Sequence, residues 1–219
     1  MLKGMHPALR PGWTLVVPVK TLVAAKTRLA EAAGPHRAAL AVAVACDTVA
    51  AALACPAVAR VVVVTGDPLA AGPLAEVGAH VVGDPEAGLN AALRHGAAEA
   101  RGLAPYAPVG ALQADLPALR PAELATALEA AAEFEQAFVP DAAEIGTTFY
   151  GVAPGVPFRP GFGGESRARH LSRGAKELTI DGIPSLRRDV DTPADLAEAL
   201  RLGVGPRTAE IAALIARGS

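Results

Sequence analysis

The sequence predicts an α/β protein with a mainly parallel sheet, and two patterns lead to this fold class. In the first half, short valine-rich runs alternate with alanine-rich helical stretches, which implies right-handed crossovers between parallel strands. In the second half, strand candidates follow one another without obvious helices between them, so we expect added antiparallel strands along the same edge. A chain of 219 residues is long enough for a single α/β domain with a sizeable core.

The elements of the first half are marked by valine runs, prolines and glycines. Apolar runs predict buried strands, and the sequence places them at 15–19, 60–65, 79–82 and 109–113. Gly66-Asp67-Pro68 and Gly83-Asp84-Pro85 end two of these strands. Pro35 and Pro121 lie where a first helical turn tolerates proline, and apolar spacing supports the other helices. Helices are therefore expected at 35–53, 69–76, 88–102 and 121–134.

The second half is more irregular. The segment 154–164 holds three prolines and four glycines, which predicts a loop. Strands are expected at 137–139, 147–152, 178–180 and 186–190, and helices at 166–174, 193–202 and from 206 onward. We expect one domain over residues 1–219, with an N-terminal leader at 1–13 and a C-terminal helix at 206–219.

Composition and charge narrow the class of partner. The net charge of −2 does not suggest a general nucleic-acid surface. Cys46 and Cys55 fit no metal spacing, and a reduced cytosol accounts for them most simply. The apolar run LVVPV is too short for a signal peptide, and no stretch approaches a membrane span. We therefore expect a cytoplasmic protein without nucleic-acid or membrane partners, and a homodimer remains open.

Two acidic clusters far apart in the chain are expected to form one site. Asp115 lies in LQADLP, and Asp189 and Asp191 lie in RRDVDTP. Strand ends converge on one edge of a parallel sheet, and two residues two apart in an extended backbone point the same way. Three carboxylates held together call for a cation, and oxygen ligands with substrate phosphates suit Mg²⁺. Phosphoryl or nucleotidyl transfer is the first hypothesis. The alternative is that each Asp ends a strand or caps a helix.

A basic loop follows the first predicted strand. Lys20, Lys26 and Arg28 lie at the end of that strand, the usual phosphate position in an open α/β sheet. The loop lacks the glycines of GxxxxGK[ST] or GxGxxG, so neither a P-loop nor a dinucleotide fingerprint applies. Phosphates would be held here by side-chain charge, with Arg28 offering a bidentate contact. The alternative is a solvated basic loop.

Two further motifs suggest ligand contacts. In DPEAGLN, Gly88 allows close approach to the backbone, and Asn90 offers a donor and an acceptor to a base or ribose. Gly146-Thr147-Thr148 and FGGES, with Gly163 and Ser166, combine hydroxyls and glycine-rich turns into a candidate anion pocket. A plain helix start and a capped surface loop are the respective alternatives.

The order and spacing of these motifs resemble a known family. PVKTLVAAKTRLA, DP–GLNAAL, LQADLPAL, GTT, FGGESRARH and DVDTPADL together resemble the guanylyltransferases of coenzyme F-420 biosynthesis. These enzymes belong to the wider group of MobA-like nucleotidyltransferases. The resemblance covers residues 16–205 and implies a three-layer α/β/α Rossmann-like nucleotidyltransferase fold. It is strongest to the branch that uses phosphoenolpyruvate, whose sister branch uses 2-phospho-L-lactate.

The resemblance also implies roles for individual residues. The substrate phosphate would attack the α-phosphorus of GTP and release pyrophosphate. Asp115, Asp189 and Asp191 would hold Mg²⁺, and Lys20 would contact phosphates as the lysine of the family's first loop. The remaining roles are GTP binding, assigned to Lys26, Arg28 and Asn90, and phosphoenolpyruvate binding, assigned to Thr148, Gly163 and Ser166.

One departure and several alternatives accompany this resemblance. The family usually reads GDLP where this chain has Ala114-Asp115-Leu116-Pro117, and an alanine could crowd the nucleotide slightly. Transfer to 2-phospho-L-lactate remains the alternative within the same class, because a pocket separates such similar shapes by only about 1–3 kcal/mol. A non-catalytic nucleotide-binding protein should have lost a metal carboxylate or the loop lysine, and this chain keeps them. A dehydrogenase is disfavoured because GxGxxG is absent.

Overall fold

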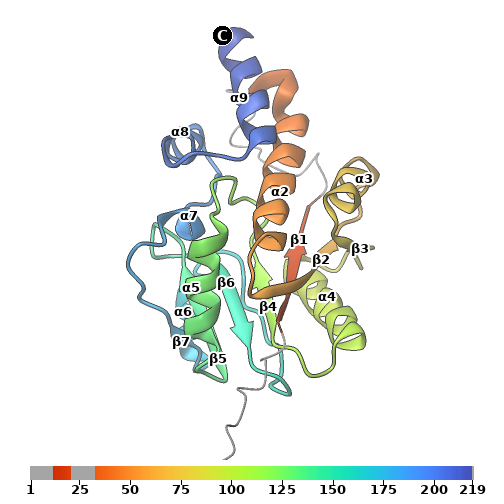
Figure 1. Cartoon of the computed structure of the whole chain (residues 1–219), viewed down its shortest axis with the longest axis vertical. Helices are drawn as coiled ribbons and strands as arrows, with labels where there is room; N and C mark the ends of the chain where they lie inside the picture. Colours follow the sequence, from red (N-terminus) through yellow and green to blue (C-terminus); the bar gives the residue numbers. More distant parts are fainter. Residues whose placement is uncertain (1–11, 21–32, 219) are drawn as a thin grey trace, which may run out of the picture.

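A computed structural model describes residues 12–20 and 33–218, and it shows a mixed sheet of seven strands in the order β3-β2-β1-β4-β6-β5-β7 (Figure 1). The strands are β1 (Trp13–Pro18), β2 (Val58–Val64), β3 (His80–Val82), β4 (Val109–Leu112), β5 (Gln136–Pro140), β6 (Thr147–Val152) and β7 (Lys176–Glu177). β1 pairs in parallel with β2 and β4, and β2 pairs in parallel with β3. β6 runs antiparallel to both β4 and β5. This confirms a mainly parallel sheet with antiparallel strands added by the second half.

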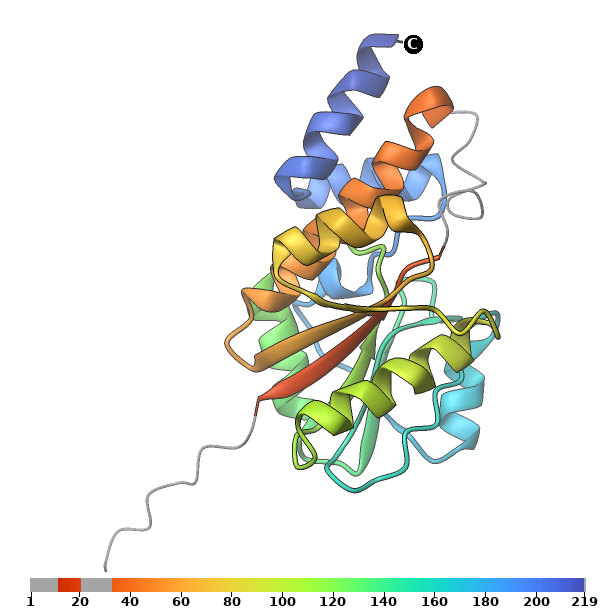
Figure 2. The same ribbon diagram turned by 90° about the vertical axis from the view of Figure 1, so that its right-hand side faces the viewer.

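Helices cover both faces of this sheet. They are η2 (Gly34–His36), α2 (Arg37–Leu53), α3 (Pro68–Val77), α4 (Leu89–Leu103), α5 (Pro121–Ala131), α6 (Ser166–Ser172), α7 (Pro184–Arg187), α8 (Pro193–Leu202) and α9 (Pro206–Gly218). α2, α3 and α5 share one core cluster with the sheet, and α4 packs in a second cluster on the other side (Figure 2). Alanine, valine and leucine fill most of both clusters, so helices and sheet approach closely and form the three layers α/β/α.

The α2 helix lies at the centre of this arrangement. Residues 34–53 form a helical stretch that is long and apolar enough to cross a membrane, judged by length and composition alone. Of its most apolar 18 residues, 56% are buried inside the fold. Leu40, Val44 and Val49 of α2 are fully or almost fully buried. The Asp47 carboxylate of α2 accepts hydrogen bonds from the backbone N–H groups of Arg207 (3.3 Å) and Thr208 (2.7 Å). Asp47 thereby caps α9, the C-terminal helix that the sequence predicts.

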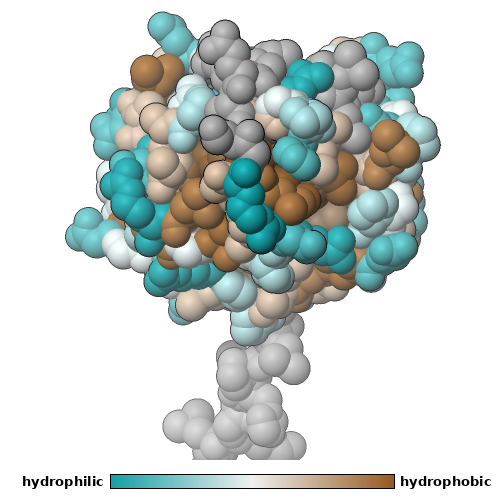
Figure 3. Space-filling view, turned by 90° about the horizontal axis from the view of Figure 1, so that it is seen from above, coloured by the Kyte–Doolittle hydropathy of each residue, from teal (hydrophilic) through white to brown (hydrophobic). Residues whose placement is uncertain are grey.

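An apolar groove lies between α2, α3 and α9. Apolar side chains reach the surface at the end of the molecule shown in Figure 3. The groove there has a volume of about 380 Å³ and is lined largely by aliphatic side chains, among them Val42, Leu69 and Ile211.

Two predicted strands are wrong. Residues 178–180 form no strand, and the edge strand β7 is only the two residues before them. Of the expected strand 186–190, residues 186 and 187 belong to the short helix α7 (Pro184–Arg187), and residues 188–190 form no strand. Glu123 of α5 explains this, because its buried carboxylate accepts hydrogen bonds from the backbone N–H (2.8 Å) and hydroxyl (2.7 Å) of Ser185. The carboxylate satisfies donors at the helix start, a role that the local sequence does not reveal.

Candidate active site

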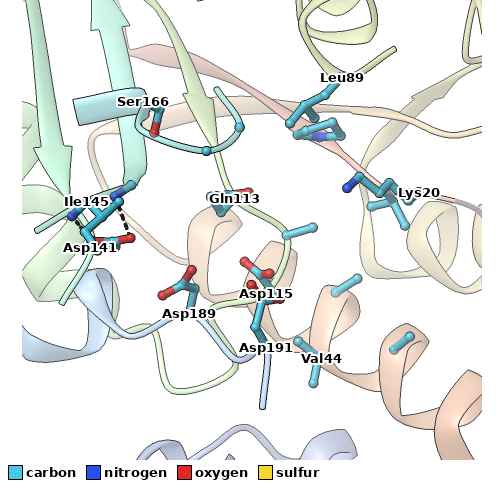
Figure 4. Close-up of a pocket in the computed structure, with 18 of the residues that line it drawn as sticks. Lys20, Val44, Leu89, Gln113, Asp115, Asp141, Ile145, Ser166, Asp189 and Asp191 are labelled. Carbon is cyan, nitrogen blue, oxygen red and sulfur yellow. Dashed lines mark hydrogen bonds between the residues drawn. The ribbon is translucent and has the colours of Figure 1, made fainter. Parts of the chain in front are cut away.

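A cavity of about 660 Å³ opens at the carboxyl ends of β1 and β4 (Figure 4). Its base is formed by residues 18–20, which follow β1, and residues 113–115, which follow β4. Its walls come from α2, the start of α4 and three connecting segments that include Gly146, Ser166 and Asp189. The cavity therefore lies where the open edge of a parallel sheet usually binds ligands.

The three aspartates predicted to act together all line this cavity. Figure 4 shows Asp115, Asp189 and Asp191 grouped on one side. The backbone N–H of Val190 donates to the backbone carbonyl of Asp115 (3.0 Å), which ties the two segments together. Asp189 and Asp191 follow α7 rather than a strand, so this tie, and not strand pairing, brings the two clusters together.

The electrostatics of this group favour a bound cation. The pKa of Asp189 is raised from 3.8 to about 7, mainly by burial and in addition by the neighbouring carboxylates of Asp115, Asp141 and Asp191. Repulsion of this kind is relieved when a cation binds among the carboxylates. Within residues 12–20 and 33–218, no three His, Cys, Asp or Glu side chains form a ready-made metal cage. An ion held here would therefore take some of its ligands from elsewhere, as Mg²⁺ does from substrate phosphates.

Asp141 is a cavity residue that sequence reasoning missed. Its carboxylate accepts hydrogen bonds from the backbone N–H groups of Ile145 (3.0 Å) and Gly146 (2.8 Å), so it closes the turn between β5 and β6. A Cβ atom at Gly146 would collide with this carboxylate. The turn presents Ile145, an aliphatic side chain that is 58% exposed, to the cavity. An Asp followed by a glycine five residues later was the only sequence signal, and it is common in turns.

Lys20 lies across the cavity from the aspartates. It directly follows β1 and its side chain is exposed and points toward the cavity (Figure 4). The arrangement sets one positive group opposite several carboxylates, with space between them for a phosphate chain and a cation. Lys26 and Arg28 lie outside the described residues.

Two of the three residues assigned to the acceptor line the cavity. Gly163 belongs to the glycine-rich segment before α6 and Ser166 is the first residue of α6, and Gly163 has a left-handed backbone with φ of 95°. No other atom lies within 4 Å of a Cβ built on Gly163, so the backbone is open to a ligand. Thr148 is fully buried in β6 and is not in the cavity wall. Its hydroxyl has no hydrogen-bond partner in the described part of the chain.

Asn90 is engaged with the protein itself. Its side-chain amide donates to the backbone carbonyl of Phe162 (2.9 Å), and its oxygen accepts from the backbone N–H of the same residue (2.9 Å). The neighbouring Leu89 reaches the cavity wall, and Asn90 does not. The structure thus places Asn90 beside the predicted nucleotide pocket, with both ends of its amide in use.

Comparison with known proteins agrees with this geometry. The model of a family described as "Guanylyl transferase CofC like" matches residues 13–215. A phosphoenolpyruvate guanylyltransferase of Streptosporangium roseum is 78% identical over 208 residues, which are 95% of this chain and 94% of that protein. The protein of the same name from Streptomyces coelicolor is 62% identical and covers 92% of this chain and 96% of its own length.

Solved structures support the fold. A nucleotidyl transferase from Methanothermobacter shares 18% identity with a TM-score of 0.55, over 87% of this chain and 98% of that one. A Mycobacterium tuberculosis protein complexed with manganese shares 18% identity with a TM-score of 0.51, over 86% of this chain and 97% of that one. These likenesses concern the fold, whereas the family match extends over almost the whole sequence. The chain is a nucleotidyltransferase, and it belongs to the CofC-like guanylyl transferase family.

Proposed function

We propose that this enzyme transfers GMP from GTP to phosphoenolpyruvate, releasing pyrophosphate and forming enolpyruvoyl-2-diphospho-5'-guanosine for coenzyme F-420 biosynthesis. The high identity to relatives named phosphoenolpyruvate guanylyltransferase supports this acceptor. The observation that carries the reaction class is the cavity itself, where Asp115, Asp189 and Asp191 face Lys20 at the carboxyl edge of the sheet.

The chemistry is a substitution at the α-phosphorus of GTP. A phosphate oxygen of the acceptor forms a bond to that phosphorus as the bond to the β-phosphate oxygen breaks, and the electron pair leaves with pyrophosphate. Lys20 would neutralise the charge that develops on the leaving group, and such preorganised charge is a large term in catalysis. Asp115, Asp189 and Asp191 would hold Mg²⁺, which when bound offsets phosphate charge and orients the phosphates.

The two substrates are assigned to different sides of the cavity. Gly163 and Ser166 line the proposed acceptor side, and we keep the buried Thr148 as an acceptor residue because its hydroxyl lacks a partner among the described residues. Lys20, Lys26 and Arg28 are assigned to GTP. The resemblance adds Asn90 to this side, but both ends of its amide bond Phe162, so we assign it no direct contact with GTP.

Acceptor-side variants should affect phosphoenolpyruvate and spare GTP. Ser166→Ala and Thr148→Val each remove a hydroxyl, and losing a hydrogen bond to a charged group costs about 1.5–3 kcal/mol in kcat/KM for the acceptor. Gly163→Val should cost more, because a β-branched residue is strained at a φ of 95° and would fill the open approach. Steady-state kinetics with both substrates varied measures this. A fall in GTP affinity with unchanged acceptor kinetics would place these residues in the nucleotide site instead.

The function is tested by pyrophosphate release from GTP with each acceptor offered separately. We expect rapid, Mg²⁺-dependent release with phosphoenolpyruvate and slower release with 2-phospho-L-lactate. Faster release with 2-phospho-L-lactate would make that the acceptor, and no release with either would favour a non-catalytic nucleotide-binding role.

The chain's composition and the relatives' names give no reason to assign a membrane or nucleic-acid partner, and we place the enzyme in the cytoplasm.

A further inference from the structure

The glycine-rich segment that lines the cavity is held by side chains from two different helices, the partly buried Asn90 of α4 and the buried His170 of α6. Gly163 and Gly164 are exposed, and both have left-handed backbones, with φ of 95° and 51°. The two residues just before them, Gly161 and Phe162, are buried and make the hydrogen bonds that hold this part of the segment. The position of the cavity wall therefore depends on how Gly161 and Phe162 are fixed.

Asn90 fixes Phe162 from the α4 side. The amide pairs with the backbone N–H and carbonyl of Phe162, 72 residues away, in two bonds of 2.9 Å each. Asn is one of the few side chains that can both accept from and donate to a single backbone residue in this way. Its neighbour Leu89 lines the same cavity, so the pair connects the start of α4 directly to the glycine-rich segment.

His170 fixes Gly161 from the α6 side. Its Nε2 accepts the backbone N–H of Gly161 (2.9 Å), so this nitrogen carries no proton and Nδ1 donates to the Thr147 hydroxyl (3.0 Å). The ring is fully buried and stacks on Tyr150 with centroids 4.7 Å apart. Burial, with the positive charges of Arg173 and Arg169, lowers its pKa from 6.5 to about 4, which keeps the imidazole neutral at physiological pH.

We infer that Asn90 and His170 are positioning residues that form a two-sided clamp on Gly161–Phe162 and so set the place of Gly163 and Ser166 in the cavity. This inference rests on the proposed function. His170 is four residues after Ser166 in the same short helix, so both lie on one face of α6. Arg169 supports the same point, because its Nε donates to the carbonyl of Gly161 (3.0 Å). Neither clamp residue touches a substrate in this account, and both act through the backbone they hold.

The test compares Asn90→Ala and His170→Ala with a matched control, Arg101→Ala. Arg101 bonds the carbonyl of Val156 in the same connection, at a point outside the cavity wall. We expect the KM for phosphoenolpyruvate to rise about tenfold in either clamp variant, the size of a lost buried hydrogen bond. The KM for GTP should stay near its original value, and the control should behave like the parent protein. His170→Gln, whose side-chain oxygen can accept the Gly161 N–H, should recover part of the loss.

Two readouts separate positioning from a general loss of structure. Combining Asn90→Ala with Ser166→Ala should give a loss smaller than the sum of the two, because both changes remove the same acceptor contact. Amide hydrogen exchange should accelerate about tenfold at Phe162 in Asn90→Ala and at Gly161 in His170→Ala, with β1 and β2 unchanged.

The clamp would be overturned by any of three results. These are equal rises in the KM values for phosphoenolpyruvate and GTP, additive losses in the double variant, or unchanged hydrogen exchange at Gly161 and Phe162. If the parent protein made no product from phosphoenolpyruvate, the proposed function would fail, whereas hydrogen exchange would still decide whether the two side chains hold the segment.

Discussion

Replacing Asp189 by Asn is expected to abolish guanylyl transfer nearly completely and at the same time to stabilise the metal-free protein at pH 8. A bound divalent cation contributes several kcal/mol of charge stabilisation, and each 1.36 kcal/mol is tenfold in rate. Loss of one ligand should therefore lower kcat by about a thousandfold. Asp115→Asn and Asp191→Asn should have the same effect on turnover, because both residues share the cavity with Asp189.

The stability effect follows from the direction of the pKa shift. The pKa of Asp189 is higher in the folded protein than in an unfolded chain, so its contribution to stability is fully present below pH 4 and is lost as the pH rises through about 7. The rise from 3.8 to about 7 corresponds to about 4 kcal/mol at most. Asn cannot ionise. The Asp189→Asn variant should therefore unfold at a higher temperature than the parent protein at pH 8, when a chelator keeps both proteins free of metal.

Pyrophosphate release and thermal unfolding in the same buffer check both parts. Asp181→Asn is the matched control, because Asp181 is exposed and lies outside the cavity wall. Near-normal rates in all three cavity variants at saturating Mg²⁺ would show that the carboxylates hold no catalytic metal. An unchanged unfolding temperature for Asp189→Asn would show that burial and the neighbouring carboxylates do not raise the pKa of Asp189 enough to affect stability.

The second large effect is expected at Lys20. Lys20→Ala should slow the chemical step by about 100- to 1000-fold, because its charge is needed most as pyrophosphate leaves. Lys26→Ala and Arg28→Ala should act more through GTP affinity. Single-turnover rates at saturating GTP isolate the chemical step. Lys176→Ala serves as the control, because that exposed lysine lies near Phe134 and outside the cavity. Unchanged turnover and GTP affinity in a variant lacking all three charges would refute a phosphate-binding role for this loop.

The sequence was sufficient to predict the parallel core of the sheet and the place of Asp115 at its edge, whereas Asp189 and Asp191 follow a helix and not the expected strand. Short apolar runs mark β1, β2 and β4 because a buried parallel strand is apolar on both faces, and carboxyl ends of such strands meet at one edge. Asp115 follows β4, so its place in the cavity could be inferred from its neighbours along the chain.

What the sequence could not show depends on partners distant along the chain. The strand expected at 186–190 is replaced by α7 because Glu123, 62 residues earlier, caps it. The amide of Asn90 looked free for a nucleotide, yet it pairs with a backbone 72 residues away. His170 appeared only as one basic residue in a helix, and its burial depends on aromatic neighbours from β5, β6 and the connecting segment. Local composition carries no record of such contacts.

The central claim, guanylyl transfer to phosphoenolpyruvate, is tested most directly by a competition reaction. Enzyme, GTP and Mg²⁺ are incubated with equal concentrations of phosphoenolpyruvate and 2-phospho-L-lactate, and the guanylylated products are identified by mass spectrometry at low conversion. We predict that enolpyruvoyl-2-diphospho-5'-guanosine is the main product and that its rate of formation falls about a thousandfold when Asp189→Asn replaces the parent enzyme. A predominance of the lactyl product, or no guanylylated product from either acceptor, would contradict the account.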